Sequence, residues 1–143
     1  MPPPKSAPKP VPRPLLTVPD LEDFERLGRK ALKSLPEPLR AQTRDVMIIV
    51  EDFPDDDVTE MMNLDTPYDL LGLYQGVALP ERSIADVGRL PDCIHLYRRP
   101  ILDYWCESGE RLDAIIHHVL LHEIGHHFGF SDEEMEELEE EEE

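Results

Sequence analysis

The stretch HEIGHHFGFSD, residues 122–132, carries the most informative pattern in the sequence. It closes a largely apolar segment that begins near residue 110, so we predict one long helix over residues 110–128. Gly129 follows directly, and glycine is the usual residue just past a helix C-terminus. His122 and His126 stand four positions apart, so their imidazoles project from one face of this helix, one turn apart. The segment therefore predicts a helix that presents two neighbouring histidines.

The spacing of these histidines suits a metal ion, because both ring nitrogens can reach one ion at roughly 2.0–2.1 Å. Glu123 lies one position after His122, where its carboxylate can approach a metal-bound water without binding the ion. A carboxylate so placed can take the proton of the water and pass it to a leaving amine. Zinc lowers the pKa of bound water from roughly 15.7 to about 7, which makes hydroxide available at neutral pH. We therefore expect Zn²⁺ on His122 and His126, with Glu123 as the catalytic base.

A third ligand is expected after the helix, because Gly129 permits a left-handed turn that folds the chain back toward the ion. Asp132 lies ten residues after His122, which is where metzincin peptidases carry their third histidine ligand. A carboxylate oxygen binds zinc at ~2.0–2.2 Å, so the offset favours Asp132, with Glu133 and Glu136 as alternatives. Three protein ligands leave the fourth position of zinc open, as a catalytic site requires.

The rest of the chain contains short strand and helix patterns. Apolar runs predict strands at residues 46–50, 70–79 and 93–99, the second bent at its two glycines. Further helices are predicted at residues 17–35, 39–43, 57–63 and 101–108. We expect Thr17 to cap the first helix and the strand VMIIV, residues 46–50, to be buried on both faces. Without regular strand–helix–strand alternation, the pattern predicts the α+β class, with a sheet of about three strands packed against the long helix.

HEIGHHFGFSDEEM, together with GLYQG (residues 72–76) and LPDCIHLYRRPIL (residues 90–102), resembles the small bacterial zincin-like metallopeptidase family. The resemblance covers about residues 45–135. It implies a minimal zincin-like fold, in which a few strands and helices surround the metal-bearing helix. It also implies that His122, His126 and Asp132 bind zinc and that Glu123 activates water. A peptide substrate would then add to an edge of the sheet, for which residues 93–99 are the expected strand.

Composition narrows the function classes further. The 143 residues carry a net charge of −18, which argues against nucleic-acid binding and against docking on an anionic membrane. No apolar run reaches the ~18–20 residues that span a bilayer, the first residues lack the apolar core of a secretory signal, and two cysteines are too few for a disulfide framework. We therefore expect a cytoplasmic protein with a disordered proline-rich arm (1–16) and an acidic poly-Glu tail (136–143). The resemblance implies that the domain between them (17–135) is zincin-like.

Two functions from different classes follow from these patterns. The first is a zinc-dependent metallopeptidase-like hydrolase that acts on a peptide or protein substrate. The alternative is a metal-binding interaction module that has no peptidase activity and acts through its acidic surface. Both leave the oligomeric state open. Tyr74, Tyr97 and Tyr104 are candidates for an oxyanion-stabilising hydroxyl or for core packing. His118 is expected in the wall of the pocket, and His127 is expected to be packed or solvated.

Overall fold

The computed structural model of the protein describes residues 17–37, 39–76, 92–131, 133–134 and 136–137. The arm at residues 1–16, residues 77–79 of the strand predicted at 70–79, and residues 138–143 of the acidic tail lie outside this range. Asp132, the expected third zinc ligand, lies outside it as well.

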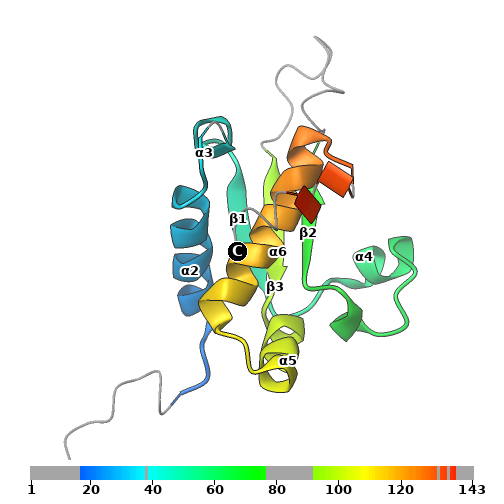
Figure 1. Ribbon diagram of the computed structural model, residues 1–143. Coiled ribbons are helices and arrows are strands. Elements are labelled where there is room, and N and C mark those ends of the chain that lie inside the picture. Colours follow the sequence, from blue (N-terminus) through cyan, green and yellow to red (C-terminus); the bar gives the residue numbers. More distant parts are fainter. Residues whose placement is uncertain (1–16, 38, 77–91, 132, 135, 138–143) are drawn as a thin grey trace, which may run out of the picture.

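The described residues form helices around a small sheet (Figure 1). The helices are α2 (Leu21–Lys33), α3 (Leu39–Gln42), α4 (Asp56–Met61), α5 (Arg98–Ser108) and α6 (Leu112–Phe128), with a 3-10 turn η1 (Pro67–Asp69). The strands are β1 (Met47–Glu51), β2 (Gly72–Gln75) and β3 (Cys93–Tyr97). They pair in the order β1-β3-β2, with β3 parallel to β1 and antiparallel to β2. This mixed sheet confirms the prediction of the α+β class.

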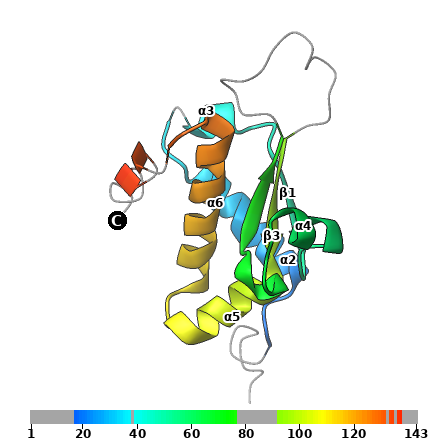
Figure 2. The same ribbon diagram turned by 90° about the vertical axis from the view of Figure 1, so that its right-hand side faces the viewer.

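Helices α2 and α6 pack on the same face of the sheet, and Figure 2 shows α6 running along it. A Cβ atom at Gly28 of α2 would lie 3.2 Å from Leu96 Cδ1 and 3.3 Å from Ile48 Cδ1, so the helix approaches the strands closely. The core between these elements is made of fully buried apolar side chains, among them Phe24, Ile94, Leu96, Ile101, Ile116 and Leu120. Each such Leu or Ile contributes about 1.5–3 kcal/mol through its removal from water, which fixes α6 against the sheet.

The first described helix begins at Leu21, so the prediction that Thr17 caps it was wrong. Asp20 is the N-cap, and it forms a reciprocal capping box with Asp23. The Asp23 backbone N–H donates to Asp20 Oδ1 at 2.8 Å, and the Asp20 N–H donates to Asp23 Oδ2 at 2.9 Å. Because two backbone donors are satisfied at once, this start is favoured over one that offers a single threonine cap.

Strand β1 is not buried on both faces, contrary to the prediction. Met47 is 52% exposed, and the other residues of β1 are only partly buried. The reason is that β1 is an edge strand whose inner face alone meets α2. Strand β3 lies in the centre and is paired on both sides, so a peptide cannot add along residues 93–99 as expected. Within the described sheet, the edges are β1 and β2.

Helix α6 ends as the sequence predicts, because Gly129 has a left-handed conformation with φ of 74°. The Phe130 backbone N–H donates to the carbonyl of Gly125 at 2.8 Å, which satisfies one of the last helical carbonyls. Just beyond, Ser131 and Glu134 exchange backbone-to-side-chain hydrogen bonds of 3.2 Å, the pattern of a second capping box. In the part of the chain that the structure describes, no helix has the length and apolar character needed to cross a membrane.

Candidate metal centre

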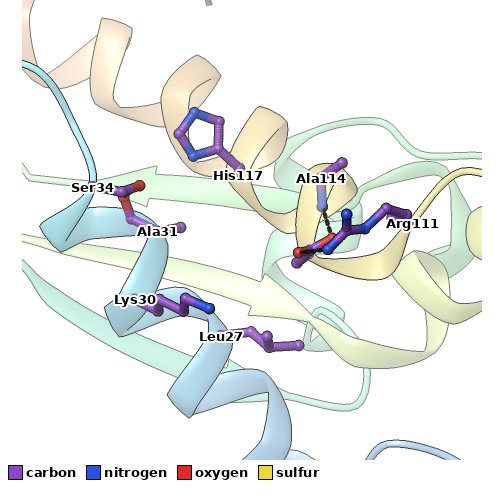
Figure 3. Close-up of a pocket in the computed structure, with 8 residues that line it drawn as sticks. Leu27, Lys30, Ala31, Ser34, Arg111, Ala114 and His117 are labelled. Carbon is purple, nitrogen blue, oxygen red and sulfur yellow. Dashed lines mark hydrogen bonds and ion pairs between the residues drawn. The ribbon is translucent and has the colours of Figure 1, made fainter. Parts of the chain in front are cut away.

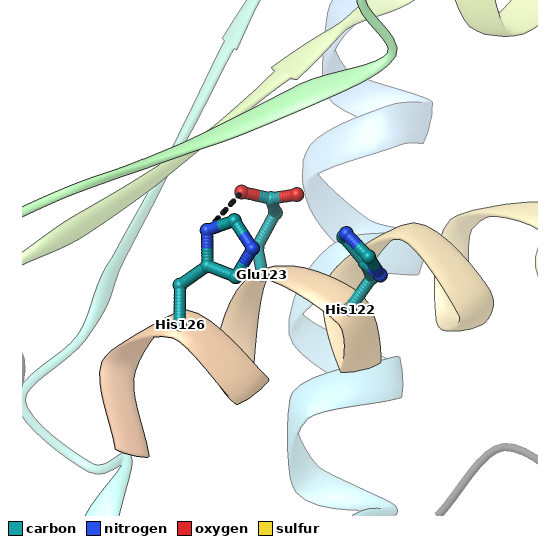
Figure 4. Close-up of side chains that lie close together, drawn as sticks. All are labelled: His122, Glu123 and His126. Atoms are coloured by element: carbon teal, nitrogen blue, oxygen red, sulfur yellow. Dashed lines mark ion pairs between the residues drawn. The ribbon is translucent and has the colours of Figure 1, made fainter. Parts of the chain in front are cut away.

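His122, Glu123 and His126 lie together on α6 (Figure 4). One potential ligand atom from each residue lies within 4.8 Å of the others. The two imidazole rings have their centroids 5.2 Å apart, and His126 Nδ1 is 3.8 Å from Glu123 Oε1. The four-residue spacing on one helix therefore produces the neighbouring pair of histidines that the sequence predicts, with the carboxylate between them and the sheet.

Glu123 is held by the edge strand rather than by its own helix. Its side chain is buried, and its Oε1 accepts a 2.8 Å hydrogen bond from the backbone N–H of Tyr74 on β2. Gly72 makes this approach possible, because a Cβ there would lie 2.7 Å from Val119 Cγ1 and 3.0 Å from the His95 carbonyl oxygen. The missing side chain lets α6 come close enough to β2 for the carboxylate to reach the strand backbone.

The site combines a buried carboxylate with a more accessible imidazole. Glu123 is 6% exposed, whereas the side chain of His126 is 49% exposed. A ligand or substrate can therefore reach the histidine from solvent while the carboxylate stays fixed behind it. This difference in exposure suits a site in which one group must keep its orientation during a reaction.

A buried polar group beside the site was not predicted. His127 Nδ1 lies 3.2 Å from Asp92 Oδ2, and both side chains are almost fully buried. The Tyr74 hydroxyl lies 3.3 Å from the same nitrogen, with the two rings meeting edge to face at 5.6 Å. Tyr74 thus contacts Glu123 through its backbone and His127 through its hydroxyl. The sequence placed His127 about 100° around the helix from His126, but it held no signal that Asp92 would face it.

Other residues considered from the sequence lie elsewhere. Tyr97 is buried on the face of β3 that carries His95, and burial followed by the negative charge of Glu51 raises the pKa of its hydroxyl. Tyr104 is exposed on α5, where a hydrogen bond to Glu110 raises its pKa. Of the three tyrosines, only Tyr74 is hydrogen-bonded to Glu123 among the described contacts.

The structure describes the two other acidic candidates for the third ligand, Glu133 and Glu136. Both are exposed, and neither belongs to the described group of His122, Glu123 and His126 that could hold an ion. Asp132 stays a prediction because it lies outside the described residues.

The donors that are described fit a divalent ion. Zinc accepts imidazole nitrogen and carboxylate oxygen as ligands. The two imidazoles, one turn apart, offer two such donors on one face of α6. The nearby Glu123 carboxylate adds negative charge that favours a cation. His122, Glu123 and His126 are therefore arranged so that they could hold a divalent ion, and their assignment as zinc ligands and catalytic base stays a prediction.

Two grooves lie at the other end of α6. One has a volume of about 310 Å³ and lies between α2 and the first turns of α6, where His117, Lys30 and Arg111 contribute to its lining (Figure 3). The other, of about 890 Å³, is lined in part by Trp105. Neither groove is lined by the His-Glu-His group. His117 thus belongs to a groove wall, and His118 is exposed on the same helix.

The comparison with protein families agrees with this arrangement. The family model for zincin-like metallopeptidases matches residues 43–142, a span that includes the strands of the sheet and the whole of α6. No curated protein matches the sequence significantly. The match covers more than half of the chain and contains HEIGH at residues 122–126. The chain therefore belongs to the zincin-like metallopeptidase family.

Proposed function

We propose that the protein is a zinc-dependent hydrolase that cleaves peptide bonds, with zinc held by His122, His126 and Asp132 and with Glu123 as the general base. One observation carries the proposal: the buried Glu123 carboxylate is fixed by the Tyr74 N–H at 2.8 Å, beside two imidazoles on the same helix. A structural zinc site has no need for such a carboxylate, since it is closed by four protein ligands. The family to which the chain belongs supports the same reaction class.

When bound, zinc supplies a Lewis acid that polarises a carbonyl oxygen and lowers the pKa of water. The chain's own residues then control the proton. Glu123 Oε1 accepts the Tyr74 N–H, so Oε2 is the oxygen that takes a proton from the attacking water. The same oxygen returns that proton to the leaving nitrogen as the carbon–nitrogen bond breaks. The hydrogen bond to the strand keeps the carboxylate in one orientation through both transfers.

We place the peptide substrate along the free edge of β2. Within the described sheet this strand is paired on one side only, and it carries Tyr74, whose backbone contacts Glu123. An extended peptide that adds to a sheet edge gains main-chain hydrogen bonds and presents its peptide groups at regular intervals. This placement brings a peptide bond next to the carboxylate, which residues 93–99 in the centre of the sheet cannot do.

We also propose a cytoplasmic location, where the free thiols of Cys93 and Cys106 would stay reduced. The net charge of −18 supports a protein rather than a nucleic acid or an anionic membrane as the partner. The same charge favours the second candidate function, an interaction module that binds zinc and a partner without cleaving it.

A peptide-cleavage profile separates the two functions. The native protein is tested against a broad peptide library in its zinc-loaded form, after removal of the metal, and after zinc is restored. The hydrolase predicts cleavage that is lost with the metal and returns with it. An absence of cleavage in the zinc-loaded form, with a full equivalent of zinc bound, would contradict the hydrolase and leave the interaction module.

A further inference from the structure

Cys93, His95 and Gln75 gather on the sheet face opposite α6. Along β3, Ile94 and Leu96 point into the core, so Cys93 and His95 point to the other face. His95 Nε2 lies 2.8 Å from the side-chain oxygen of Gln75, and the Cys93 sulfur lies 3.5 Å from that nitrogen. The sulfur is also 3.7 Å from the Gln75 oxygen. Three potential donor atoms thus converge from two neighbouring strands.

The distance between the Cys93 sulfur and the His95 Nε2 nitrogen matches that between two ligands of one ion. Zinc binds thiolate at about 2.3 Å and imidazole at about 2.0–2.1 Å with tetrahedral angles, which places sulfur and nitrogen ~3.5 Å apart. The observed separation of Cys93 Sγ and His95 Nε2 is 3.5 Å. The spacing of the pair therefore suits one shared ion. The Gln75 oxygen, which lies at a hydrogen-bond distance of 2.8 Å from Nε2, would have to move back slightly to act as a weaker third donor.

The other ring nitrogen of His95 has the partner that a metal-binding histidine usually has. His95 Nδ1 lies 2.6 Å from Glu51 Oε1 on β1. In the free site the Nε2–H can donate to the Gln75 oxygen, and an ion that binds at Nε2 takes the place of this proton. The Nδ1–H can then donate to the Glu51 carboxylate, and such carboxylate–histidine pairs orient metal ligands. Tyr97 adds to this orientation, since its ring stacks on His95 with centroids 6.1 Å apart.

The same group is poorly suited to nucleophilic catalysis. Burial, and then the negative charge of Glu51, raise the pKa of the Cys93 thiol, so the free side chain is protonated at neutral pH. A reactive cysteine requires the opposite environment. A bound cation, in contrast, removes the thiol proton directly and is attracted by the same carboxylate.

We propose that Cys93 and His95, assisted by the Gln75 oxygen, form a second metal site that binds a thiolate-preferring ion of the Zn²⁺ class. The site is independent of the α6 centre and goes beyond the proposed hydrolase. It is open to solvent, because Cys93 is partly exposed and Gln75 is exposed. Among the described residues, an ion can therefore enter beside the exposed Gln75. Glu51 acts through His95 and is a positioning residue for this site.

Cobalt(II) titration of the full-length, metal-free protein tests the proposal. Thiolate ligation produces a strong near-ultraviolet charge-transfer band, which the oxygen and nitrogen donors of the α6 centre do not give. We expect the band in the native protein, in His126→Ala and in Cys106→Ser, whose thiol is exposed on α5. We expect Cys93→Ser to lose the band together with one equivalent of cobalt, and Glu51→Gln to weaken this binding about 10–100-fold. A native protein without the band, or a band that Cys106→Ser removes, would overturn the proposal.

Alkylation of the native chain gives a second test that needs no variant. Iodoacetamide reacts with both thiols, and mass spectrometry reports each one separately. We expect zinc to slow the alkylation of Cys93 at least about tenfold, because a metal-bound thiolate is less available to react. The alkylation rate of Cys106 should stay unchanged. Equal rates for Cys93 with and without zinc would contradict the site even if every variant proved unstable.

Discussion

The backbone N–H of Tyr74 on β2 donates a 2.8 Å hydrogen bond to Oε1 of Glu123 on α6, 49 positions later in the chain. The orientation of the proposed base is thus set by the edge of the sheet. Tyr74 also places its hydroxyl 3.3 Å from His127, so one residue links the carboxylate to the buried His127–Asp92 pair. Any change that displaces β2 from α6 is therefore expected to act on Glu123 as well as on stability.

Substitution of Gly72 tests the close approach between β2 and α6. In Gly72→Ala the new Cβ would lie 2.7 Å from Val119 and 3.0 Å from a backbone oxygen, so β2 or α6 must shift. We expect the free energy of unfolding to fall by about 1–3 kcal/mol and peptide cleavage to fall with it, measured by urea denaturation and by initial rates.

Gly28→Ala is the matched control for that substitution. The three nearest atoms to its Cβ would be side-chain carbons of Leu96 and Ile48 at 3.2–3.3 Å, whereas at Gly72 one contact is closer than 3.0 Å and another is with a backbone oxygen. A glycine-to-alanine change inside a helix also gains up to about 1 kcal/mol of helix propensity, which offsets the crowding. Equal destabilisation of the two variants would show that the contact between β2 and α6 is not unusually tight.

The Asp92–His127 pair is expected to contribute to stability because it is buried. Asp92→Asn weakens a 3.2 Å contact between side chains that are 5% and 3% exposed. We expect a loss of about 1–3 kcal/mol, the cost of poorly satisfied buried polar groups. Glu25→Gln, which removes the exposed ion pair with Arg29, should cost about 0.3–0.5 kcal/mol. Thermal or urea unfolding of both variants measures the difference, and similar small losses would mean that the buried pair is dispensable.

The zinc content of variants distinguishes the role of His126 from that of His118 on α6. His126→Ala removes one of two adjacent imidazole donors, so we expect zinc at the α6 centre to be lost. His118→Ala removes an exposed imidazole that lies eight residues from His126 on the same helix, about 12 Å along the axis. That variant should retain the zinc. Elemental analysis after dialysis measures both, and unchanged zinc in His126→Ala would remove the site assignment.

Much of α6 follows from local rules. The helix ends where glycine can adopt a positive φ, and His122 and His126 meet because they are one turn apart. These features depend on residues within one or two turns of each other, so sequence spacing alone predicts them. Glu123 was also predicted to lie next to the histidines for the same reason.

The features that were missed depend on residues far apart in the chain. The hydrogen bond from Tyr74 to Glu123 and the pairing of Asp92 with His127 require the sheet order β1-β3-β2, which no local pattern encodes. The same order makes β3 central and β1 an edge, and it explains why Met47 is exposed in a strand of apolar residues. The prediction that Thr17 caps the first helix was wrong for a local reason, because Asp20 offers the stronger, reciprocal cap.

In the proposed mechanism Glu123 moves the proton in a zinc-dependent cleavage, and Glu123→Gln removes this role alone. The glutamine keeps the size of the side chain and an oxygen that can accept the Tyr74 N–H, but it is no longer a base. The measurement is kcat/KM on the best peptide of the library, for native and variant proteins with equal zinc content at the α6 centre. We predict a drop of about 10²–10⁴-fold with the zinc retained. Cleavage by zinc-loaded Glu123→Gln at the native rate would show that Glu123 is not the general base.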